Sequence, residues 1–423
     1  MTSAAFRILL HHPAVRTLAS VAEGTECHLV GGILRDRFLG LESKDIDAVV
    51  CGRGREIAEE LAKVLPARLV LLGGKEFAAY RLVAEDVDVD LWDRAGTSLY
   101  EDLARRDFTL NSVALEIRTG EVTDPFDGLG DLGRRRLRAT TPESFTGDPL
   151  RVLRLPRMLL RLPGFAADPE TLVLARRSSE KIVDVAAERV RDELSYLFDH
   201  PDAHLGLVML VALDLYPGLW EGTPGEPGRP GGAVTELEAL PERLLELREI
   251  DPEISVDAKT ARWAATFAHL PADRLERFRD AGFIIRSEAA KVALLLSFES
   301  LPEDEIGRRR FLHRAGPLWP TVAVSLGARS EDATRWRSAL RPLVDLARRE
   351  GALLFDPPRL LTGGEVQELL GIPAGPKVGE ALAAVRQAQV DGTVRTREEA
   401  LALLHSPSPG AGGREGSGEG AGG

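Results

Sequence analysis

The hydrophobic periodicity of the chain changes close to Pro142, and this change limits the folds that are open to it. Before Pro142, short apolar runs alternate with helical stretches, which is typical of a mixed arrangement of strands and helices. After it, apolar residues recur at i, i+3 and i+4, the spacing of amphipathic helices. The strand-like runs are HLV, DIDAVV, ARLVLLG, AAYRLV, VDVDLW, VALEI and GEVTD, and the helical runs include DPLRVLRLPRMLLRL, PETLVLARRS, AAERVRDELSYLF and HLGLVMLVALDLY. We therefore expect an α+β first part that is followed by helices only.

The length of 423 residues predicts more than one domain, because domains usually contain about 100–200 residues. The segment EGTPGEPGRPGGAV, residues 221–234, is rich in Pro and Gly and predicts a loop or linker. The end of the chain is of low complexity, and we expect it to be disordered. The expected units are a mixed head (1–140), a helical neck (141–220), a helical body (235–355), a helical tail (356–405) and the disordered end (406–423).

The composition places the chain among soluble globular proteins, with 44% hydrophobic and 28% charged residues. No apolar run approaches the ~20 residues of a membrane span, and the N-terminus lacks the pattern of a signal peptide. We therefore expect a cytoplasmic protein with no membrane partner. The net charge of −12 argues against a surface that is positive all over, but it leaves room for a local basic groove that attracts phosphate.

Two aspartates stand one residue apart in the strand-like run DIDAVV, although Asp is depleted in strands. Strand alternation places Asp45 and Asp47 on one face and the apolar residues between them on the other. Two carboxylates at this spacing can share one or two Mg²⁺ ions, which activate an attacking hydroxyl and neutralise a leaving pyrophosphate. The alternative is a charged strand that only discourages aggregation.

A double glycine upstream adds a second element to this hypothesis. Gly31 and Gly32 follow the run HLV and open the helix ILRDRFL, so backbone N–H groups can face an anion, with Arg35 one turn further on. Alone, this pattern indicates only a tight turn. Together with the aspartate pair, it outlines a site for a nucleoside triphosphate. For a third carboxylate, the run VDVDLW offers both Asp88 and Asp90 on one face.

Charged and amide side chains precede the next predicted strand. The segment EDLARRDFTLNSVALEI contains Arg105, Arg106, Asp107 and Asn111, which combine charge with hydrogen-bonding capacity. As local sequence, this segment is equally compatible with a capped helix end whose arginines are solvated.

Taken in order, these pieces resemble a known family. The runs GGILRD, DID, RRDFTLN, DPFDGLGDL, ESFTGDPLRVLR and ERVRDEL, over residues 28–194, are similar to the motifs of the class II tRNA nucleotidyltransferase (CCA-adding enzyme) and bacterial poly(A) polymerase family. The segment LLTGGEVQELLGIPAGPKVGEAL resembles the C-terminal part of that family, whereas residues 235–350 match it weakly. The resemblance implies a DNA polymerase beta-like nucleotidyltransferase head, a mixed sheet with helices, followed by an all-α neck, body and RNA-binding tail.

The resemblance also implies roles for individual residues. It makes Asp45 and Asp47 the catalytic pair that binds Mg²⁺, with Asp90 as the third acidic residue and Asp88 as second choice. Nucleotide contacts are implied for Gly31, Gly32, Arg35, Arg106, Asp107 and Asn111, with Asp36 bracing the turn.

Base selection is implied for Asp148 and Arg151, which we expect at i and i+3 on one helix face. A carboxylate accepts from an exocyclic amine and a guanidinium donates to ring acceptors, so this pair can read C or A without a template strand. The same helix continues with a basic stripe of Arg154, Arg157 and Arg161, suited to phosphate. Glu188 and Arg191 resemble a brace for the selecting pair, and their alternative is an ordinary ion pair within one helix.

We therefore expect an enzyme that adds C and/or A from CTP and ATP to the 3′ end of tRNA, with no obligatory protein partner. Only seventeen positions separate Asp90 from Asp107. This segment is too short for the flexible loop of many CCA-adding members of the family that it resembles, a loop associated there with the switch from C to A incorporation. A CC-adding specialist and a poly(A) polymerase are the alternatives within this class. From other classes, an RNA-binding protein without activity and a helical scaffold remain, and neither needs the aspartate pair together with the double glycine.

Overall fold

The computed structural model describes residues 2–72, 79–94, 96–215, 219 and 231–405. The chain forms two compact units. The first contains Met1–Val234 and Pro271–Ile285, and the second contains Thr235–Leu270 and Arg286–Gly423. The end expected to be disordered, 406–423, and residues 221–230 of the expected linker lie outside the described residues.

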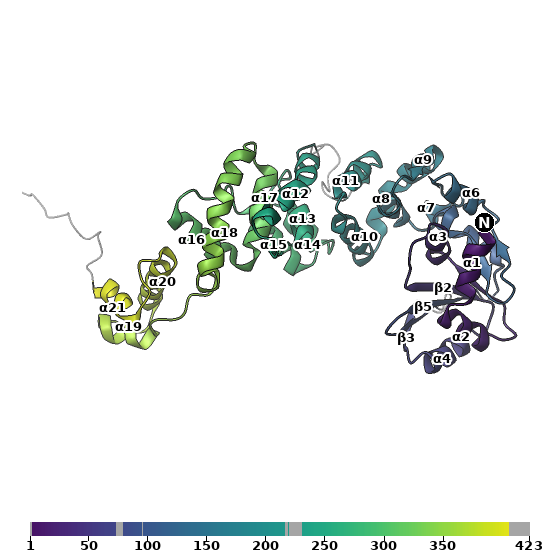
Figure 1. The fold of residues 1–423 in the computed structure, drawn as a ribbon, viewed down its shortest axis with the longest axis horizontal. Helices are drawn as coiled ribbons and strands as arrows, with labels where there is room; N and C mark the ends of the chain where they lie inside the picture. Colours follow the sequence, from purple (N-terminus) through teal and green to yellow (C-terminus); the bar gives the residue numbers. More distant parts are fainter. Residues whose placement is uncertain (1, 73–78, 95, 216–218, 220–230, 406–423) are drawn as a thin grey trace, which may run out of the picture. The chain divides into compact units, whose positions relative to one another are not determined.

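The first unit is built on a seven-stranded sheet with the strand order β3-β4-β5-β2-β1-β6-β7 (Figure 1). β2 and β5 are parallel, and the other neighbouring strands are antiparallel, so the sheet is mixed as expected. The strands are β1 (Cys27–Val30), β2 (Asp45–Val50), β3 (Arg68–Leu72), β4 (Ala79–Val83), β5 (Asp88–Asp93), β6 (Ala114–Glu116) and β7 (Val122–Thr123).

Helices surround this sheet and continue beyond it. They are α1 (Thr2–Leu10), α2 (Pro13–Val21), α3 (Gly32–Phe38), α4 (Gly54–Val64), α5 (Leu99–Ala104), α6 (Gly128–Gly133), α7 (Ser144–Gly147), α8 (Arg151–Arg161), α9 (Pro169–Ser178), α10 (Ala187–Asp199), α11 (Ala203–Ala212) and α14 (Arg274–Asp280). β8 (Arg136–Leu137) pairs in parallel with β9 (Ala166–Ala167), and β9 is a short strand where only helices were expected after Pro142. The packing of α8 against α10 and α11 follows from their apolar faces.

The two faces of the sheet differ in character because successive strand residues point to opposite sides. On one face, Leu82 of β4 and Leu91 of β5 join Ile46 of β2 in a core that α4 covers through Ile57 and Leu61. Asp45, Asp47, Asp90 and their cross-strand neighbour Arg81 belong to the opposite face. The alternating sequence pattern thus places these apolar residues in the core under α4 and the acidic residues on the face that α4 does not cover.

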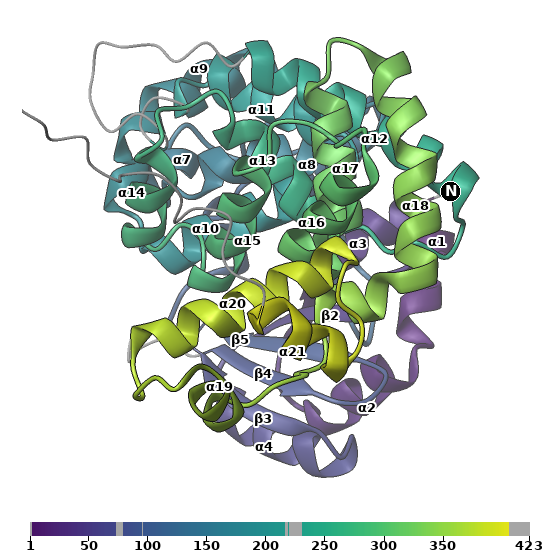
Figure 2. The same ribbon diagram turned by 90° about the vertical axis from the view of Figure 1, so that its left-hand side faces the viewer.

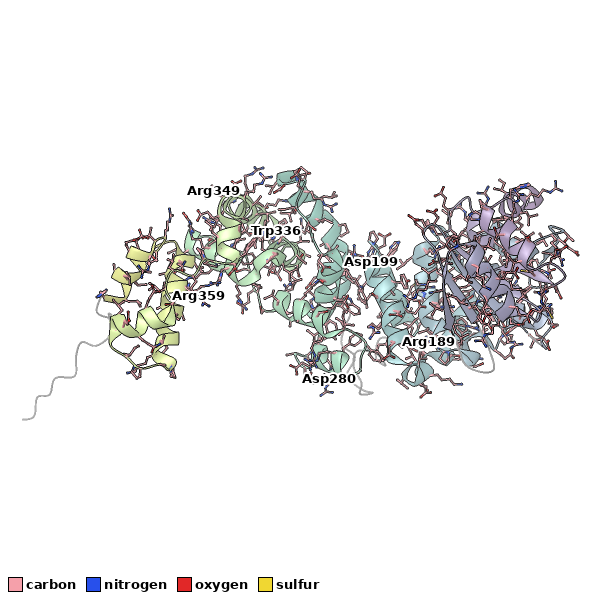
Figure 3. The ribbon with its side chains drawn as sticks, turned by 90° about the horizontal axis from the view of Figure 1, so that it is seen from below. Arg189, Asp199, Asp280, Trp336, Arg349 and Arg359 are labelled. Carbon is pink, nitrogen blue, oxygen red and sulfur yellow. The ribbon has the colours of Figure 1, made fainter. Side chains whose placement is uncertain are left out.

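The second unit is helical in its described part. It contains α12 (Gly231–Ile250, which begins at the end of the first unit), α13 (Ala258–Phe267), α15 (Arg286–Leu296), α16 (Glu305–Ala315), α17 (Trp319–Arg329), α18 (Ala333–Phe355), α19 (Gly363–Leu370), α20 (Pro376–Asp391) and α21 (Arg397–His405). α16 packs against α18 (Figure 2). Trp336 of α18, labelled in Figure 3, is buried and donates its indole N–H to the carbonyl of Ala323 at 2.9 Å.

Two expected boundaries differ from the structure. Residues 231–234 of the expected linker form the first turn of α12, because a helix can begin with Gly when the following residues are apolar and packed. Residues 271–285, expected in the helical body, pack with the first unit, where Arg191 donates to the carbonyl of Gly282 at 3.3 Å. No helix in the described ranges is long and apolar enough to cross a membrane.

Candidate active site

The aspartate pair lies at the start of β2, on the face of the sheet that α4 does not cover. Asp45 is exposed and Asp47 is partly buried, while Ile46 between them is buried in the core. β5 runs parallel to β2 in a register that sets Asp90 directly beside Asp47 and Asp88 beside Asp45. Burial raises the pKa of Asp47, and the charges of Asp90 and Asp45 raise it further against the opposing effect of Arg106. Binding of a cation would relieve this accumulation of negative charge.

Asp90 is engaged by an arginine that sequence reasoning missed. Arg81 of β4 lies opposite Asp90 in the antiparallel register, and its Nε donates to Asp90 Oδ1 at 2.7 Å while Nη2 contacts Oδ2. The hydrogen bonds to Asp90 raise the pKa of Arg81. Both oxygens of Asp90 are therefore occupied by a guanidinium fork. The cross-strand position of Arg81 is set by the register of β4 with β5, which the sequence does not state.

Gly31 occupies a position that other residues cannot take without strain. It precedes α3 with φ of 76°, and a Cβ atom built on it would lie 2.8 Å from Asp47 Oδ2. The backbone N–H of Gly32 donates to the Asp47 carboxylate and lowers its pKa. The double glycine thus allows the start of α3 to approach the aspartate pair closely.

Arg35 and Asp36 form a buried ion pair at the wall of the site. Arg35 Nε donates to Asp36 Oδ1 at 2.7 Å, and Arg35 Nη1 donates to Asn111 Oδ1 at 2.9 Å. Asp36 also accepts from Arg161 of α8 at 2.9 Å. Asp36 therefore holds Arg35 in place and ties α3 to α8.

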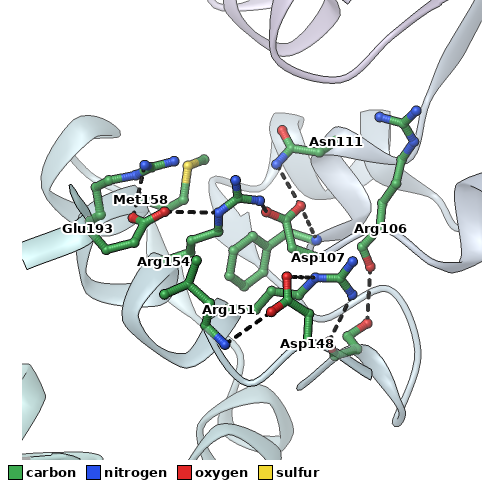
Figure 4. Close-up of polar contacts among 12 residues, drawn as sticks. Arg106, Asp107, Asn111, Asp148, Arg151, Arg154, Met158 and Glu193 are labelled. Carbon is green, nitrogen blue, oxygen red and sulfur yellow. Dashed lines mark hydrogen bonds and ion pairs between the residues drawn. The ribbon is translucent and has the colours of Figure 1, made fainter. Parts of the chain in front are cut away.

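The RRDF segment turns after α5 and places Asp107 at the centre of a network (Figure 4). Asp107 Oδ1 accepts from Asn111 Nδ2 at 2.9 Å and from the Phe108 N–H at 2.8 Å, and Oδ2 accepts from Arg154 at 3.3 Å. Burial opposes ionisation of Asp107, but these partners outweigh it and lower its pKa. Arg106 points elsewhere, to Asp102 at 3.0 Å and toward Gly31.

These side chains surround one cleft of about 620 Å³, within the range of small-molecule sites. The cleft is lined by Gly31, Gly32, Ile33, Arg35, Asp36, Ser43, Asp45, Asp47, Arg81, Asp90, Trp92, Asp102, Arg105, Arg106, Asp107, Asn111, Arg151, Arg154, Arg157, Met158 and Arg161. Arginines outnumber aspartates among these residues, although the whole chain is acidic. The fold thus segregates positive charge around a small group of carboxylates.

The selecting pair differs in one respect from the expected helix face. Asp148 is not helical: it has φ of −147° and ψ of 97° and lies between α7 and α8. Pro149 explains this, because the residue before a proline is disfavoured in the α region. The pair still meets, since Arg151 Nε lies 4.0 Å from Asp148 Oδ2. Arg151 lines the cleft, and Arg189 of α10 holds the Asp148 carboxylate at 2.8 Å.

Arg151 retains an unused donor. Its Nη1 donates to the carbonyl of Ser144 at 2.8 Å, and its Nη2 contacts the carbonyl of Arg105. Its Nε is buried without a hydrogen-bond partner among the described residues. Burial lowers the pKa of Arg151. A buried donor that lacks a partner beside a carboxylate is suited to a polar ligand.

The described contacts of Arg191 are not with the selecting pair, and Glu188 is exposed. Arg191 contacts Gly282 and lies 3.9 Å from Asp192. The contacts to the cleft come instead from their neighbours on α10: Arg189, labelled in Figure 3, on Asp148, and Glu193 on the basic stripe. Both lie on the side of α10 that faces α8. Which residues of α10 face α8 depends on how the two helices pack, and residue spacing alone does not predict it.

Glu193 neutralises two arginines of the basic stripe. It pairs with Arg154 Nε at 3.2 Å and with Arg157 Nη1 at 2.9 Å, and Arg157 also stacks over the ring of Tyr196. Its side chain is 6% exposed, and it occupies an apolar stripe with Val190, Leu194 and Leu197. An acid within an apolar stripe is the sequence signal that could have identified Glu193 as a paired, buried residue.

The donor set of the aspartate pair fits a hard divalent cation. Carboxylate oxygens are the ligands that Mg²⁺ prefers, and Mg²⁺ is usually held by one or two carboxylates together with substrate phosphates. Among the residues that the structure describes, no three His, Cys, Asp or Glu side chains converge as a ready-made metal site, because Arg81 occupies Asp90. The pair of Asp45 and Asp47 is thus a partial site that phosphates and water would complete.

The chain is similar to known proteins along most of its length. Residues 27–138 match the family model described as poly A polymerase head domain, and residues 164–223 match that of the probable RNA and SrmB-binding site of polymerase A. A CC-adding tRNA nucleotidyltransferase of Geobacter sulfurreducens is 30% identical and covers 93% of this chain and 95% of its own. An A-adding tRNA nucleotidyltransferase of Deinococcus radiodurans is 32% identical, over 89% and 94%. A CC-adding tRNA nucleotidyltransferase of Thermus thermophilus is 31% identical, over 89% and 92%.

Solved structures share the fold. A CCA-adding enzyme in complex with CTP superposes with a TM-score of 0.70 at 22% identity, over 95% of this chain and 98% of that one. The Thermotoga maritima CCA-adding enzyme complexed with tRNA has a TM-score of 0.63 at 23% identity, over 92% and 93%. At this identity, the likeness concerns the arrangement of sheet and helices.

Proposed function

Because this chain belongs to the class II tRNA nucleotidyltransferase family, which includes the CCA-, CC- and A-adding enzymes, we propose that it is a CC-adding enzyme. As a member of that family, it is a nucleotidyltransferase that adds nucleotides to the 3′ end of tRNA. The finer assignment is that it transfers CMP from CTP twice and then stops. The observation that carries the catalytic part is the cleft in which Asp45 and Asp47 face a ring of arginines.

Asp45 and Asp47 are the residues that would hold Mg²⁺. When bound there, the ion would activate the attacking 3′-hydroxyl and neutralise the leaving pyrophosphate. Asp90 has the position of a third carboxylate, but Arg81 holds it in the described structure. Asp88 pairs with Asp45 across the strands but is not among the residues that line the cleft, so we assign the third position to Asp90.

The triphosphate would lie between the aspartate pair and the start of α3. Gly31 and Gly32 keep this approach free of side chains, and Arg106 points toward Gly31. A guanidinium and backbone N–H groups on one side, and carboxylates on the other, match a phosphate chain that carries a divalent cation. Asp107 and Asn111 hold the neighbouring arginines in place for this role.

The nucleobase would be read by Arg151 and Asp148. Arg151 offers its Nε, which has no hydrogen-bond partner among the described residues. The Asp148 carboxylate can accept a hydrogen bond from an exocyclic amine of the base while it also accepts one from Arg189. Arg154 and Arg157 are held by Asp107 and Glu193, which keeps them at the cleft wall. Selection would thus rest on protein side chains alone.

The short connection between β5 and α5 favours CC addition. β5 ends at Asp93, and α5 begins at Leu99 with a capping box of Ser98 and Glu101. Thr97 donates its N–H to the carbonyl of Arg94 at 2.8 Å, so the described part of the connection is a tight turn. In the family, a longer loop at this place is associated with the switch from C to A. CC-adding relatives are 30% and 31% identical and an A-adding relative is 32% identical, so the assignment rests on the short connection and not on overall identity.

The decisive experiment offers CTP and ATP separately to the purified full chain with Mg²⁺. The acceptors are tRNA transcripts that end in the discriminator base, in C or in CC. We expect addition of two residues from CTP to the first acceptor, one to the second, and no extension of the third by either nucleotide. Extension of the CC-ended transcript by a single A would make the protein an A- or CCA-adding enzyme, and a long A tract would make it a poly(A) polymerase.

A further inference from the structure

Trp92 places a large exposed aromatic ring in the cleft, and no role proposed above uses it. It lies on β5 two residues after Asp90, lines the cleft, and is 41% exposed. Tryptophan is on average highly buried, so a half-open indole beside charged residues needs a reason. The alternating residues Val89 and Leu91 of the same strand are buried in the core.

The direct cross-strand neighbours of Trp92 are buried, and the face is exposed one pair further along β4, at Arg81. The cross-strand neighbours of Trp92 are Ala79 of β4 and Val49 of β2. The next pair on the same face of β4 and β5 is Arg81 with Asp90. Arg81 and Val83 of β4 are exposed, whereas Tyr80 and Leu82 point to the face that α4 covers. The β4–β5 part of the sheet therefore offers solvent an accessible surface that continues from the carboxylates.

The order of the strands gives this surface a direction. β2 with its aspartate pair lies between β1, which leads into the double glycine, and β5, which carries Asp90 and Trp92. In nucleotidyl transfer, the attacking and the leaving oxygen lie roughly in line on opposite sides of the phosphorus. If the leaving pyrophosphate lies on the side of Gly31 and Arg106, the attacking 3′-hydroxyl approaches from the side of β5.

We propose that Trp92 is a stacking platform for the 3′-terminal base of the acceptor RNA, an inference that rests on the proposed nucleotidyl transfer to tRNA. Stacking on an aromatic ring tolerates any base, because every base has a π face. This suits an acceptor whose terminal base differs from one addition to the next. Trp92 is thus an acceptor-binding residue that positions the 3′-hydroxyl at the aspartate pair, and it leaves base selection to other residues.

The test compares Trp92→Ala and Trp92→Phe with the wild-type chain on two acceptors. One is the tRNA transcript that ends in the discriminator base, and the other has an abasic nucleotide at this last position. On the normal acceptor, we expect Trp92→Ala to lower kcat/KM for RNA about tenfold, with the KM for CTP unchanged, and Trp92→Phe to stay within about threefold of wild type. Removing the base should cost the wild type the same factor of about ten and should cost Trp92→Ala nothing more.

Tyr100→Ala is the matched control, because Tyr100 is an exposed aromatic residue of α5 that packs on Phe126 outside the cleft lining. It should leave kcat/KM for RNA unchanged. The inference is overturned if Trp92→Ala equals wild type, if its loss persists on the abasic acceptor, or if the KM for CTP rises instead. If Trp92→Ala does not fold, tryptophan fluorescence replaces it as the test. The proposal then requires that the normal acceptor quenches the fluorescence of the wild-type chain, that the abasic acceptor does not, and that Trp92→Phe loses this quenching. A wild-type chain that extends no transcript would refute the proposed function instead.

Discussion

Two aspartates of the cleft, Asp47 and Asp107, have pKa values that are shifted in opposite directions. Asp47 and Asp107 are both largely shielded from solvent, and burial alone raises the pKa of either. For Asp47, burial is the largest cause and the carboxylates of Asp90 and Asp45 add to it, so its pKa is raised in spite of Arg106. Asp107 has Arg154, Asn111 and a backbone N–H beside it, so its pKa is lowered. The first is suited to take up a cation, and the second is a permanent anion that fixes an arginine.

Loss of one acid from the pair should abolish activity without unfolding the protein. We expect Asp47→Asn to lower the rate of CTP addition by at least about 100-fold, because the cation site loses a charged ligand. Asp88→Asn is the matched control on the neighbouring strand, and it should retain the wild-type rate within about twofold. Single-turnover extension assays measure both, and an active Asp47→Asn chain would remove the metal assignment.

Removal of Arg81 should make the cleft a better cation site. Arg81 occupies both oxygens of Asp90, so its replacement by Gln frees a carboxylate and deletes a nearby positive charge. At about 1 kcal/mol for one such charge, Mn²⁺ should bind about fivefold more tightly in the absence of nucleotide.

Electron paramagnetic resonance titration of free Mn²⁺ measures this affinity directly. Arg53→Gln is the control, since Arg53 pairs with Glu56 at 3.0 Å outside the cleft lining. It should leave the Mn²⁺ affinity at the wild-type value. Weaker Mn²⁺ binding by Arg81→Gln would mean that Arg81 orients Asp90 for the metal and does not compete with it.

At the scale of elements, α8 forms part of the wall of the cleft, and α10 supports it through polar contacts on an otherwise apolar face. Arg154 and Arg157 of α8 meet Glu193 of α10, whose side chain is almost inaccessible. Arg154 extends the chain of contacts to Asp107 in the RRDF segment (Figure 4). A buried acid that serves two arginines links these helices to the part of the site next to the sheet.

Glu193→Ala should therefore destabilise the first unit more than a substitution elsewhere on α10. It leaves two arginines without their buried partner, and we expect a loss of about 3 kcal/mol in the free energy of unfolding. Glu188→Ala, at an exposed position of the same helix, should stay within about 0.5 kcal/mol of wild type. Urea unfolding followed by circular dichroism measures both, and equal effects would contradict the placement of the brace at Glu193.

At the scale of the whole molecule, charge is segregated. The chain carries a net charge of −12, yet arginines outnumber aspartates around the cleft. RNA is therefore attracted locally, and not by the protein as a whole. α19 and α20 share a small core of Val366, Val378 and Val385, and RNA binding by the helices of residues 356–405 stays a prediction.

Binding of a tRNA transcript should weaken steeply with salt in spite of the acidic total charge. Each phosphate contact by an arginine releases counterions, so the logarithm of the Kd should rise linearly with the logarithm of the salt concentration. With several contacts, a slope of about 3 or more is expected between 50 and 200 mM salt. Fluorescence anisotropy of a labelled transcript measures it, and a slope near zero would show that binding does not depend on arginine–phosphate contacts.

Much of this protein was readable from its sequence because the relevant patterns are local. Strand alternation in DIDAVV placed Asp45 and Asp47 on one face, the double glycine marked a close approach, and the periodicity after Pro142 predicted helices. Pro149 also contained the reason why Asp148 is not helical, although the helix expectation overlooked it. Such features depend on neighbouring residues within a few positions.

The tertiary structure alone decided which side chains meet across the chain. The sequence by itself determined the mixed head, the helical remainder and the acidic pair, since these depend on periodicity and on short motifs. The pairing of Arg81 with Asp90, the choice of Glu193 and Arg189 over Glu188 and Arg191, and the exposure of Trp92 depend on sheet register and helix packing. Contacts between residues far apart in sequence are set by how whole elements pack, and no local pattern contains that information.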